Sequence, residues 1–304
     1  MITEKVLSEL KAICVESEIL EDEPMKLHTT FRIGGKADAF LSVYSEKELQ
    51  EIIAYLNREE IPFYVMGNGS NLLVSDEGYR GVILQLAEGF AEIKQEENCI
   101  YAEAGALLSK VASVATNAGL TGMEFASGIP GSMGGAIVMN AGAYDGEMKG
   151  IVKDVHLISR TGEKKILSCE EMKFSYRHSI LKECDDIVVG VTLQLTPGDK
   201  EAITDKIKDF AQRRREKQPL EYPSAGSTFK RPEGYFAGKL IMDAGLRGFC
   251  VGGAQVSEKH CGFVINKGDA TAKDVQQLMQ EVKQTVLEKY GVELEPEVIF
   301  LGDH

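Results

Sequence analysis

Apolar residues recur every three or four positions in several stretches, which is the spacing of one face of an α-helix. The clearest stretch is 271–291, whose stripe consists of Val275, Leu278, Met279, Val282, Val286 and Tyr290. Thr271 and Asp274 form a capping-box pair at its start, and Gly291 is typical of a helix end. The same period predicts helices over 45–60 and 106–119, an amphipathic helix at the N-terminus and a charged helix over 200–217.

Runs rich in β-branched and aromatic residues alternate with these helices and predict strands. They cover 63–67, 81–86, 99–105, 152–159, 186–195, 260–266 and 292–301. Thr161 and Gly162 are predicted to form a hairpin tip. Helices and strands are mixed along the chain, so the fold class is α/β or α+β. We expect a first domain over 1–200, a connecting helix over 201–217 and a second domain over 218–304.

Composition narrows the class of protein. The 304 residues are 43% hydrophobic and 27% charged, as in a soluble globular protein. The apolar runs are too short to cross a membrane, and the N-terminus lacks the pattern of a secretory signal, so we expect a cytoplasmic protein. Six cysteines and five histidines are scattered without ligand spacing, which argues against a disulfide framework or a bound metal.

The formal net charge of −13 disfavours nucleic acid or an anionic membrane as a partner. Between Lys206 and Arg247, however, ten Lys and Arg residues face five Asp and Glu residues. This excess favours a small anionic ligand in that region. For Arg213 to Arg215 alone, a solvated helix face is the better interpretation.

Two glycine-rich segments suggest a nucleotide cofactor. SGIPGSMGGAIVMNAGAYDGE (127–147) contains six glycines, and MGNGSNLLVSD (66–76) follows a predicted strand. Small residues let successive backbone N–H groups point at one cluster of phosphate oxygens. Neither segment has the glycine spacing of a Rossmann or P-loop motif. A tight turn or a bulge explains either one equally well, but the two together favour a cofactor.

An ordered set of motifs resembles the UDP-N-acetylenolpyruvoylglucosamine reductase family, also called UDP-N-acetylmuramate dehydrogenases. The set consists of HTTFRIGGKAD (28–38), GNGSNLL (67–73), GIPGSMGGAIVMNAGAY (128–144), FSYRHSIL (174–181), SAGSTFKRP (224–232) and LEPEV (294–298). The resemblance implies an α+β fold with a two-lobed FAD-binding domain of the vanillyl-alcohol-oxidase (PCMH) type, followed by a C-terminal α+β substrate-binding domain. It also implies NADPH as hydride donor and a place in peptidoglycan precursor synthesis.

The resemblance further implies that FAD is bound without a covalent link. Its pyrophosphate would lie against Asn68, Gly69, Ser70, Asn71 and Leu72 and against Gly128, Ile129, Pro130, Gly131, Ser132, Gly134, Gly135 and Ala136. Asn140, Gly142 and Ala143 would lie near the flavin.

The implied reaction adds hydride to an enolpyruvyl double bond and a proton to the neighbouring carbon. Such an alkene accepts hydride only if the charge pushed onto its carboxylate is stabilised. By resemblance, Arg177 binds the carboxylate, Ser227 donates the proton and Glu297 stabilises the enolate. From the residues alone, Arg177 could be a surface arginine, Ser227 a turn residue, and Glu295 an alternative to Glu297.

Basic residues in the second domain are candidates for the UDP end of the substrate. They are Lys230, Arg231, Lys239, Arg247 and His260. Tyr235 and Phe236 could stack on the uracil or pack in the core. Only fifty residues separate Arg177 from Ser227, and Tyr222 is the only tyrosine between them. The chain is thus similar to the shorter class of the family, which lacks the long substrate loop.

Two other functions fit parts of the pattern. A flavin oxidase of the same fold would keep the glycine segments but would not need the arginine, serine and glutamate. A nucleotide-binding module without catalysis would leave all three unexplained. For the reductase we expect small-molecule partners only, with no nucleic acid or membrane, and a monomer or weak homo-oligomer.

Overall fold

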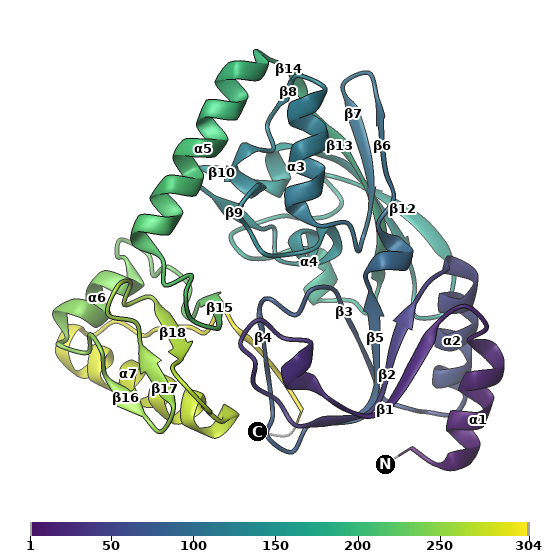
Figure 1. The fold of residues 1–304 in the computed structure, drawn as a ribbon, viewed down its shortest axis with the longest axis horizontal. Coiled ribbons are helices and arrows are strands. Elements are labelled where there is room, and N and C mark those ends of the chain that lie inside the picture. The colour runs from purple at the N-terminus through teal and green to yellow at the C-terminus, as the bar shows by residue number, and fades with distance from the viewer. Residues whose placement is uncertain (1, 303–304) are drawn as a thin grey trace. The chain divides into compact units, whose positions relative to one another are not determined.

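The computed structural model describes residues 2–302, and its chain divides into two compact units (Figure 1). Unit 1 contains the chain up to Glu21, together with Asp38–Asn68 and Gly81–Arg213. Unit 2 contains Asp22–Ala37, Gly69–Arg80 and the chain from Arg214 onward. Each unit has its own cluster of buried apolar side chains. The first two segments of unit 2 precede most of unit 1 in sequence, so the units are not contiguous stretches of chain.

Unit 1 is built around two sheets. The four-stranded sheet has the order β1 (Glu18–Pro24), β2 (Lys36–Val43), β5 (Tyr79–Leu86), β3 (Phe63–Met66), and the boundary between the units falls within β1, β2 and β5. The five-stranded sheet is antiparallel and has the order β12 (Lys164–Ser168), β11 (Val152–Ile158), β13 (Ile187–Gln194), β7 (Cys99–Glu103), β6 (Ile93–Glu96). The sheets bury their apolar faces with the helices α1 (Glu4–Ile13), α2 (Glu46–Arg58), α3 (Leu108–Asn117) and α4 (Met133–Val138).

Unit 1 also contains four short strands, two of which lie within the glycine-rich segment 127–147. They are the hairpin strands β9 (Gly142–Ala143) and β10 (Gly146–Glu147), and the paired strands β8 (Leu120–Thr121) and β14 (Thr196–Pro197). Helix α5 (Lys200–Lys217) follows and continues into unit 2 after Arg213.

Unit 2 combines a small antiparallel sheet with two helices. The sheet has the order β15 (Ser224–Ser227), β18 (Phe263–Asn266), β17 (Ala254–Val256), β16 (Cys250–Val251). Helix α7 (Ala272–Tyr290) packs against β16 and β17, and α6 (Ala237–Asp243) packs against α7. The last strand, β19 (Ile299–Leu301), pairs in parallel with β4 (Leu72–Val74) from the early part of the chain.

The predicted helices are confirmed with small shifts at their ends. The capping box of Thr271 and Asp274 is present in α7, and Gly291 ends the helix in the left-handed region with φ of +67°. The hairpin tip at Thr161 and Gly162 is also confirmed, since β11 and β12 pair on either side of it.

The strand predicted over 292–301 is too long, because only Ile299–Leu301 is regular strand. Pro296 cannot donate to a strand ladder and interrupts this run. The sequence does not predict helix α4, because its glycines interrupt the apolar pattern. Met133, Ala136 and Ile137 are nevertheless buried on one face of this helix.

Candidate active site

The two glycine-rich segments meet in unit 1. A side chain at Gly67 would overlap the Ser132 hydroxyl, so only glycine allows this approach. Beside it, the Asn68 amide Nδ2 donates to the Pro130 carbonyl over 2.8 Å. The start of the first segment, at Gly67 and Asn68, is therefore in contact with Pro130 and Ser132 of the second.

Ser132, which lies at this contact, carries a buried hydroxyl that the described residues leave without a hydrogen bond. The residue is 3% exposed, and its Oγ has no hydrogen-bond partner in the part of the chain that the structure describes. A buried hydroxyl without a partner is costly and is normally satisfied by water or a ligand. Next to it, Gly135 is exposed, and a Cβ there would meet only Ser132 Oγ, at 3.7 Å. The open glycine and the unsatisfied hydroxyl fit a phosphate-bearing cofactor such as FAD.

Many backbone amides of 128–136 are already used inside the protein. Those of Ile129, Gly131, Met133, Gly134 and Ala136 donate to the carbonyls of Ala126, Ile129, Ala106, Ala104 and Ser132. The expected cradle of successive N–H groups is therefore largely committed to the fold. The Ser132 hydroxyl and the open side at Gly135 are the groups best placed to contact the cofactor.

The rest of the first glycine loop belongs to unit 2. Gly69 has φ of +59°, and its carbonyl accepts a hydrogen bond from the Thr30 amide over 3.2 Å. The Asn71 amide Nδ2 donates to the Glu297 carbonyl over 3.0 Å, and the Asn71 carbonyl accepts from the Ile299 amide over 2.9 Å. This loop, predicted to hold FAD through Gly69 to Leu72, is thus tied to the main chain of a predicted catalytic residue.

Asn140 is fully buried, and its side chain bonds within the protein. Its Nδ2 donates to the Ser175 carbonyl at 2.9 Å and to Glu147 Oε2 at 3.0 Å, and its Oδ1 accepts from the Lys149 amide at 2.9 Å. A flavin contact through this amide would have to replace one of these bonds. Gly142 and Ala143, the other predicted flavin neighbours, form strand β9 of the adjacent hairpin.

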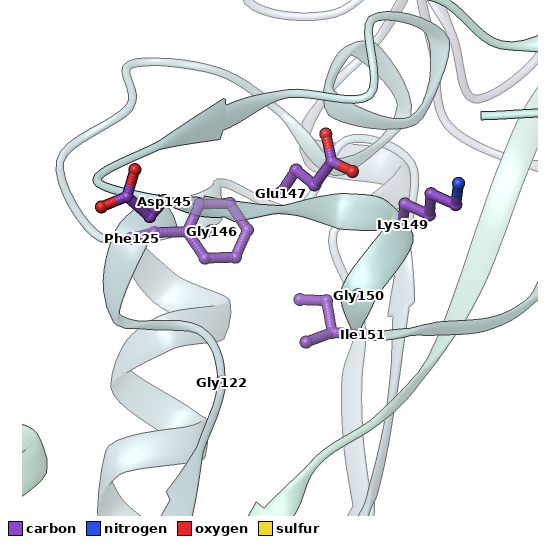
Figure 2. A pocket seen from close by; sticks show the side chains of 8 residues that line it. All are labelled: Gly122, Phe125, Asp145, Gly146, Glu147, Lys149, Gly150 and Ile151. Carbon is purple, nitrogen blue, oxygen red and sulfur yellow. The ribbon is translucent and has the colours of Figure 1, made fainter. Parts of the chain in front are cut away.

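A pocket of unit 1 lies beside the same hairpin. Figure 2 shows its lining, which consists of Gly122, Phe125, Asp145, Gly146, Glu147, Lys149, Gly150 and Ile151. Any side chain at Gly146 would collide with the Phe125 ring, whose nearest atom lies 2.6 Å from the Cβ position. The hairpin is therefore packed tightly on this side.

Arg177 lies in a tight turn of unit 1 with φ of +54°. Ser175 and His178 close this turn by exchanging two backbone hydrogen bonds of 3.1 Å. The Arg177 guanidinium donates through Nη2 to the Gly142 carbonyl over 3.1 Å. The side chain is half-buried and anchored, rather than extended into solvent as a surface arginine would be.

Ser227 and Glu297 lie next to each other in unit 2. The Glu297 amide donates to the Thr228 carbonyl over 2.9 Å, one residue after Ser227. Gly226, with φ of +75°, interrupts the register of β15 just before Ser227. Such a bulge redirects the following side chain and is common beside active sites. The predicted donor and the predicted enolate stabiliser are thus neighbours.

Glu295, the sequence-based alternative to Glu297, differs in its surroundings. Its carboxylate forms an ion pair with Lys230 at 2.9 Å and its side chain is 69% exposed. The hydrogen bond from Lys230 and the charge of that lysine lower the pKa of Glu295. An exposed carboxylate held ionised by a lysine is a poor proton donor, and this favours Glu297.

The basic residues predicted for the UDP end have varied partners within unit 2. Lys239 pairs with Asp243 at 2.8 Å, Arg247 Nη2 lies 3.0 Å from Met242 Sδ, and the Arg231 guanidinium lies 3.9 Å from the Phe236 ring centroid. Tyr235 and Phe236 are exposed, which rules out the core packing considered for them.

His260 differs from these basic residues. Burial lowers the pKa of His260, and its Nδ1 accepts from the Gly262 amide over 3.1 Å. The ring is therefore neutral near pH 7 and offers a phosphate an Nε2–H donor rather than a positive charge.

Comparison with known proteins defines the class. A family model for an FAD-binding domain matches residues 37–168. A second model, the C-terminal domain of UDP-N-acetylenolpyruvoylglucosamine reductase, matches residues 218–301. The chain is therefore a flavoprotein with an FAD-binding domain and a separate C-terminal domain, which confirms the predicted fold class.

Full-length relatives identify the family. The chain is 53% identical to the UDP-N-acetylenolpyruvoylglucosamine reductase of Caldanaerobacter subterraneus subsp. tengcongensis, over 99% of both chains. It is also 53% identical to the reductase of Agathobacter rectalis, over 94% of both chains. The crystal structure of the reductase from Thermus caldophilus superposes with a TM-score of 0.81 at 36% identity, covering 94% of this chain and 99% of that one. The chain belongs to the UDP-N-acetylenolpyruvoylglucosamine reductase family, as its motifs predicted.

Proposed function

We propose that the protein reduces UDP-N-acetylglucosamine enolpyruvate to UDP-N-acetylmuramate, with FAD as cofactor and NADPH as reductant, for peptidoglycan precursor synthesis. The observation that carries this proposal is the 53% identity to a reductase of that name over 99% of both chains. Asn68, Ser132 and Gly135 would hold the FAD, together with the other residues predicted for the two glycine segments. When bound and reduced, the flavin supplies the hydride that adds to the enolpyruvyl double bond.

Arg177 binds the carboxylate of the enolpyruvyl group. A guanidinium stays charged at all physiological pH values, and its planar fork matches a carboxylate. The hydrogen bond from Nη2 to the Gly142 carbonyl supports this role, because it fixes the plane of the group before substrate arrives. Charge that moves onto the carboxylate during hydride addition then meets a fixed positive group.

Ser227 donates a proton to the carbon beside the one that receives hydride. Its hydroxyl is a weak acid, so it must be aimed at that carbon, and the bulge at Gly226 supports such an orientation. Glu297 stabilises the enolate that exists before the proton arrives. The hydrogen bond between the Glu297 amide and the Thr228 carbonyl supports this pairing of roles, because it holds the main chain of Glu297 beside the strand that carries Ser227.

We place the enzyme in the cytoplasm as a monomer or weak homo-oligomer. Two observations support a location away from the membrane interior: the relatives carry a small-molecule reductase name, and within residues 2–302 every helix is too short or too polar to cross a bilayer. The residues proposed to contact the UDP phosphates are Lys230, Arg231, Lys239, Arg247 and His260.

The deciding experiment follows NADPH oxidation in the absence of oxygen, with and without UDP-N-acetylglucosamine enolpyruvate. Sustained turnover should require the sugar nucleotide. Ser227→Ala should leave flavin reduction by NADPH intact and block transfer to substrate. Turnover that ignores the sugar nucleotide would disprove the reductase function, and loss of both half-reactions in Ser227→Ala would disprove the donor role.

A further inference from the structure

The turn that carries Arg177 is attached to Gly142 of the β9–β10 hairpin and to Asn140, two residues before this hairpin. The Arg177 guanidinium donates to the Gly142 carbonyl at 3.1 Å, and the Asn140 amide donates to the Ser175 carbonyl at 2.9 Å. The hairpin therefore holds the side chain of the arginine, and Asn140 holds the main chain of its turn. Any shift of the hairpin changes the direction of the guanidinium.

Asn140 connects the hairpin to this turn from the inside. Its second amide hydrogen bond goes to Glu147 on β10, and its oxygen accepts from the Lys149 amide just beyond β10. Both ends of the amide are therefore satisfied, and the residue is 0% exposed. A fully bonded, buried amide of this kind fixes the relative position of the segments that it joins.

The tip of the hairpin has a conformation that its residues do not favour. Tyr144 and Asp145 form the two-residue loop, with φ of +49° and +64°. This type of loop normally contains Asn-Gly or Asp-Gly, and a tyrosine there is strained. An outside contact must therefore hold the tip in place.

Helix α5 supplies that contact. The Tyr144 ring stacks on Phe210 with centroids 4.3 Å apart and an interplanar angle of 9°. Tyr144 Oη also donates to the Phe210 carbonyl over 3.3 Å. Phe210 is 9% exposed, so α5 presents a buried ring to the hairpin tip.

We propose that Asn140 and Tyr144 are positioning residues for Arg177, with Phe210 as the anchor on α5. Together they hold the β9–β10 hairpin so that the Gly142 carbonyl aims the guanidinium at the substrate carboxylate. Gly142 and Ala143 are also the predicted flavin neighbours. The same short segment would therefore set the distance between the flavin and the guanidinium of Arg177. This inference rests on the proposed role of Arg177.

The test uses the full-length holoenzyme with Phe210→Leu, which removes the stacked ring. Misplacing the anchor should slow flavin oxidation by the enolpyruvyl substrate about tenfold. Calorimetry with oxidised enzyme should show binding of the same substrate weakened by a similar factor. Flavin reduction by NADPH should stay within about twofold of the parent value. Phe210→Tyr keeps the ring and should restore parent behaviour.

Ile203→Val is the matched control, because Ile203 is a buried residue of the same helix and lies seven positions before Phe210. It should lower the melting temperature without changing either half-reaction. If Phe210→Leu fails to fold, Tyr144→Asn removes the same stack with a residue that tolerates positive φ. Equal kinetics for Phe210→Leu, or this substitute, and Ile203→Val would overturn the proposal.

Arg177→Ala separates this proposal from the function on which it rests. If Arg177→Ala leaves substrate binding and flavin oxidation unchanged, the proposed role of Arg177 fails. If Arg177→Ala is impaired and Phe210→Leu is not, only the positioning role fails. Adding Phe210→Leu to Arg177→Ala should produce no further loss, because the anchored group is already absent.

Discussion

Two adjacent glycines of the segment that is predicted to bind the FAD phosphates, Gly134 and Gly135, have different surroundings. A Cβ at Gly134 would lie 3.1 Å from Ala104 Cβ and 3.3 Å from the Ala104 carbonyl oxygen, and the Gly134 amide already bonds that carbonyl at 2.7 Å. Gly134 therefore lets α4 pack closely against the end of β7. Gly135 faces open space and leaves room for a ligand.

We predict opposite consequences for Gly135→Leu and Gly134→Leu. Gly135→Leu should abolish FAD binding while the apoprotein keeps its melting temperature, because Gly135 faces open space and leucine is a better helix former than glycine. Gly134→Leu should lower the melting temperature of the apoprotein, because it overpacks a close contact at a typical cost of about 1–3 kcal/mol. FAD titration by flavin fluorescence and thermal melts of the apoproteins measure both. Normal FAD affinity in Gly135→Leu would contradict the assignment.

At the level of residues, the sequence motifs name candidates for the chemistry, and their catalytic roles stay predictions. Arg177, Ser227 and Glu297 could be named because motifs surround them. The partners of Asn140 could not be predicted, because Ser175 lies thirty-five positions further along the chain. An asparagine within a glycine-rich segment also suggests a ligand contact, and only the structure reveals its internal bonds.

Among the elements, α2 carries an unusual buried carboxylate. Glu48 is 6% exposed and accepts hydrogen bonds from the backbone amides of Val15, Glu16 and Ser17 and from the Ser17 hydroxyl. Burial alone would raise its pKa, but these hydrogen bonds together lower it below the usual value for glutamate. The ionised group therefore holds the segment after α1 against the start of α2.

We predict that Glu48 makes stability depend on pH. Because its pKa is lowered by folding, its contribution is present above the usual glutamate value and disappears as the pH falls through the lowered value. Glu48→Gln should destabilise the protein at pH 7 by about 1–3 kcal/mol, since buried donors lose their acceptor. It should also flatten the pH dependence of the urea midpoint between neutral and acid pH.

Glu51→Gln is the control for this prediction. Glu51 is on the same helix, is half exposed and pairs with Lys47 at 3.9 Å, so its removal should change the urea midpoint little. Equal effects of the two substitutions would show that the hydrogen-bonded carboxylate is unimportant.

Elements with local signals were predictable, and those that need distant partners were not. Helix α7 combines an apolar stripe, a capping box and a terminal glycine, and its bounds were predicted within one residue at each end. Strand β19 is three residues long, and its partner β4 lies more than two hundred residues earlier in the chain. Such a pairing leaves no periodic pattern in the sequence around it.

For the whole molecule, the decisive feature is that unit 2 is assembled from three chain segments. Phe31, Ile33 and Leu73 are at most 2% exposed and pack with residues of α6, α7 and the C-terminal sheet. Leu73 lies 40 positions after Ile33, and the C-terminal segment starts at Arg214, 141 positions after Leu73. These separations hide the core from sequence analysis. The family model of the C-terminal domain covers residues 218–301, and this stretch contains only part of the core of unit 2.

We predict that a fragment of residues 214–304 does not fold stably alone. It lacks three buried side chains worth about 1.5–3 kcal/mol each, and this sum approaches the whole stability of a typical domain at about 5–15 kcal/mol. It also lacks β4, the partner of β19. Proton NMR of the fragment should show poor dispersion, and urea should unfold it without a cooperative transition.

Phe31→Ala in the full-length chain supplies the comparison for the fragment. It should destabilise unit 2 by about 3–5 kcal/mol, as judged by hydrogen exchange of β17 and β18 amides. A dispersed spectrum and cooperative unfolding of the fragment would instead support a contiguous C-terminal domain.

The hydrogen bond from Asn71 to the Glu297 carbonyl connects the predicted cofactor loop to a predicted catalytic residue. A loop predicted to hold the cofactor and the main chain of the predicted enolate stabiliser order one another through this bond and through the Ile299 amide. Coupling between two binding events is reciprocal. A compound that binds beside Glu297 and orders this segment therefore raises the affinity for FAD. FAD raises the affinity for the compound by the same factor. Inhibitors of this enzyme can therefore be sought as compounds that slow the release of FAD, which is followed by the yellow colour that stays with the protein.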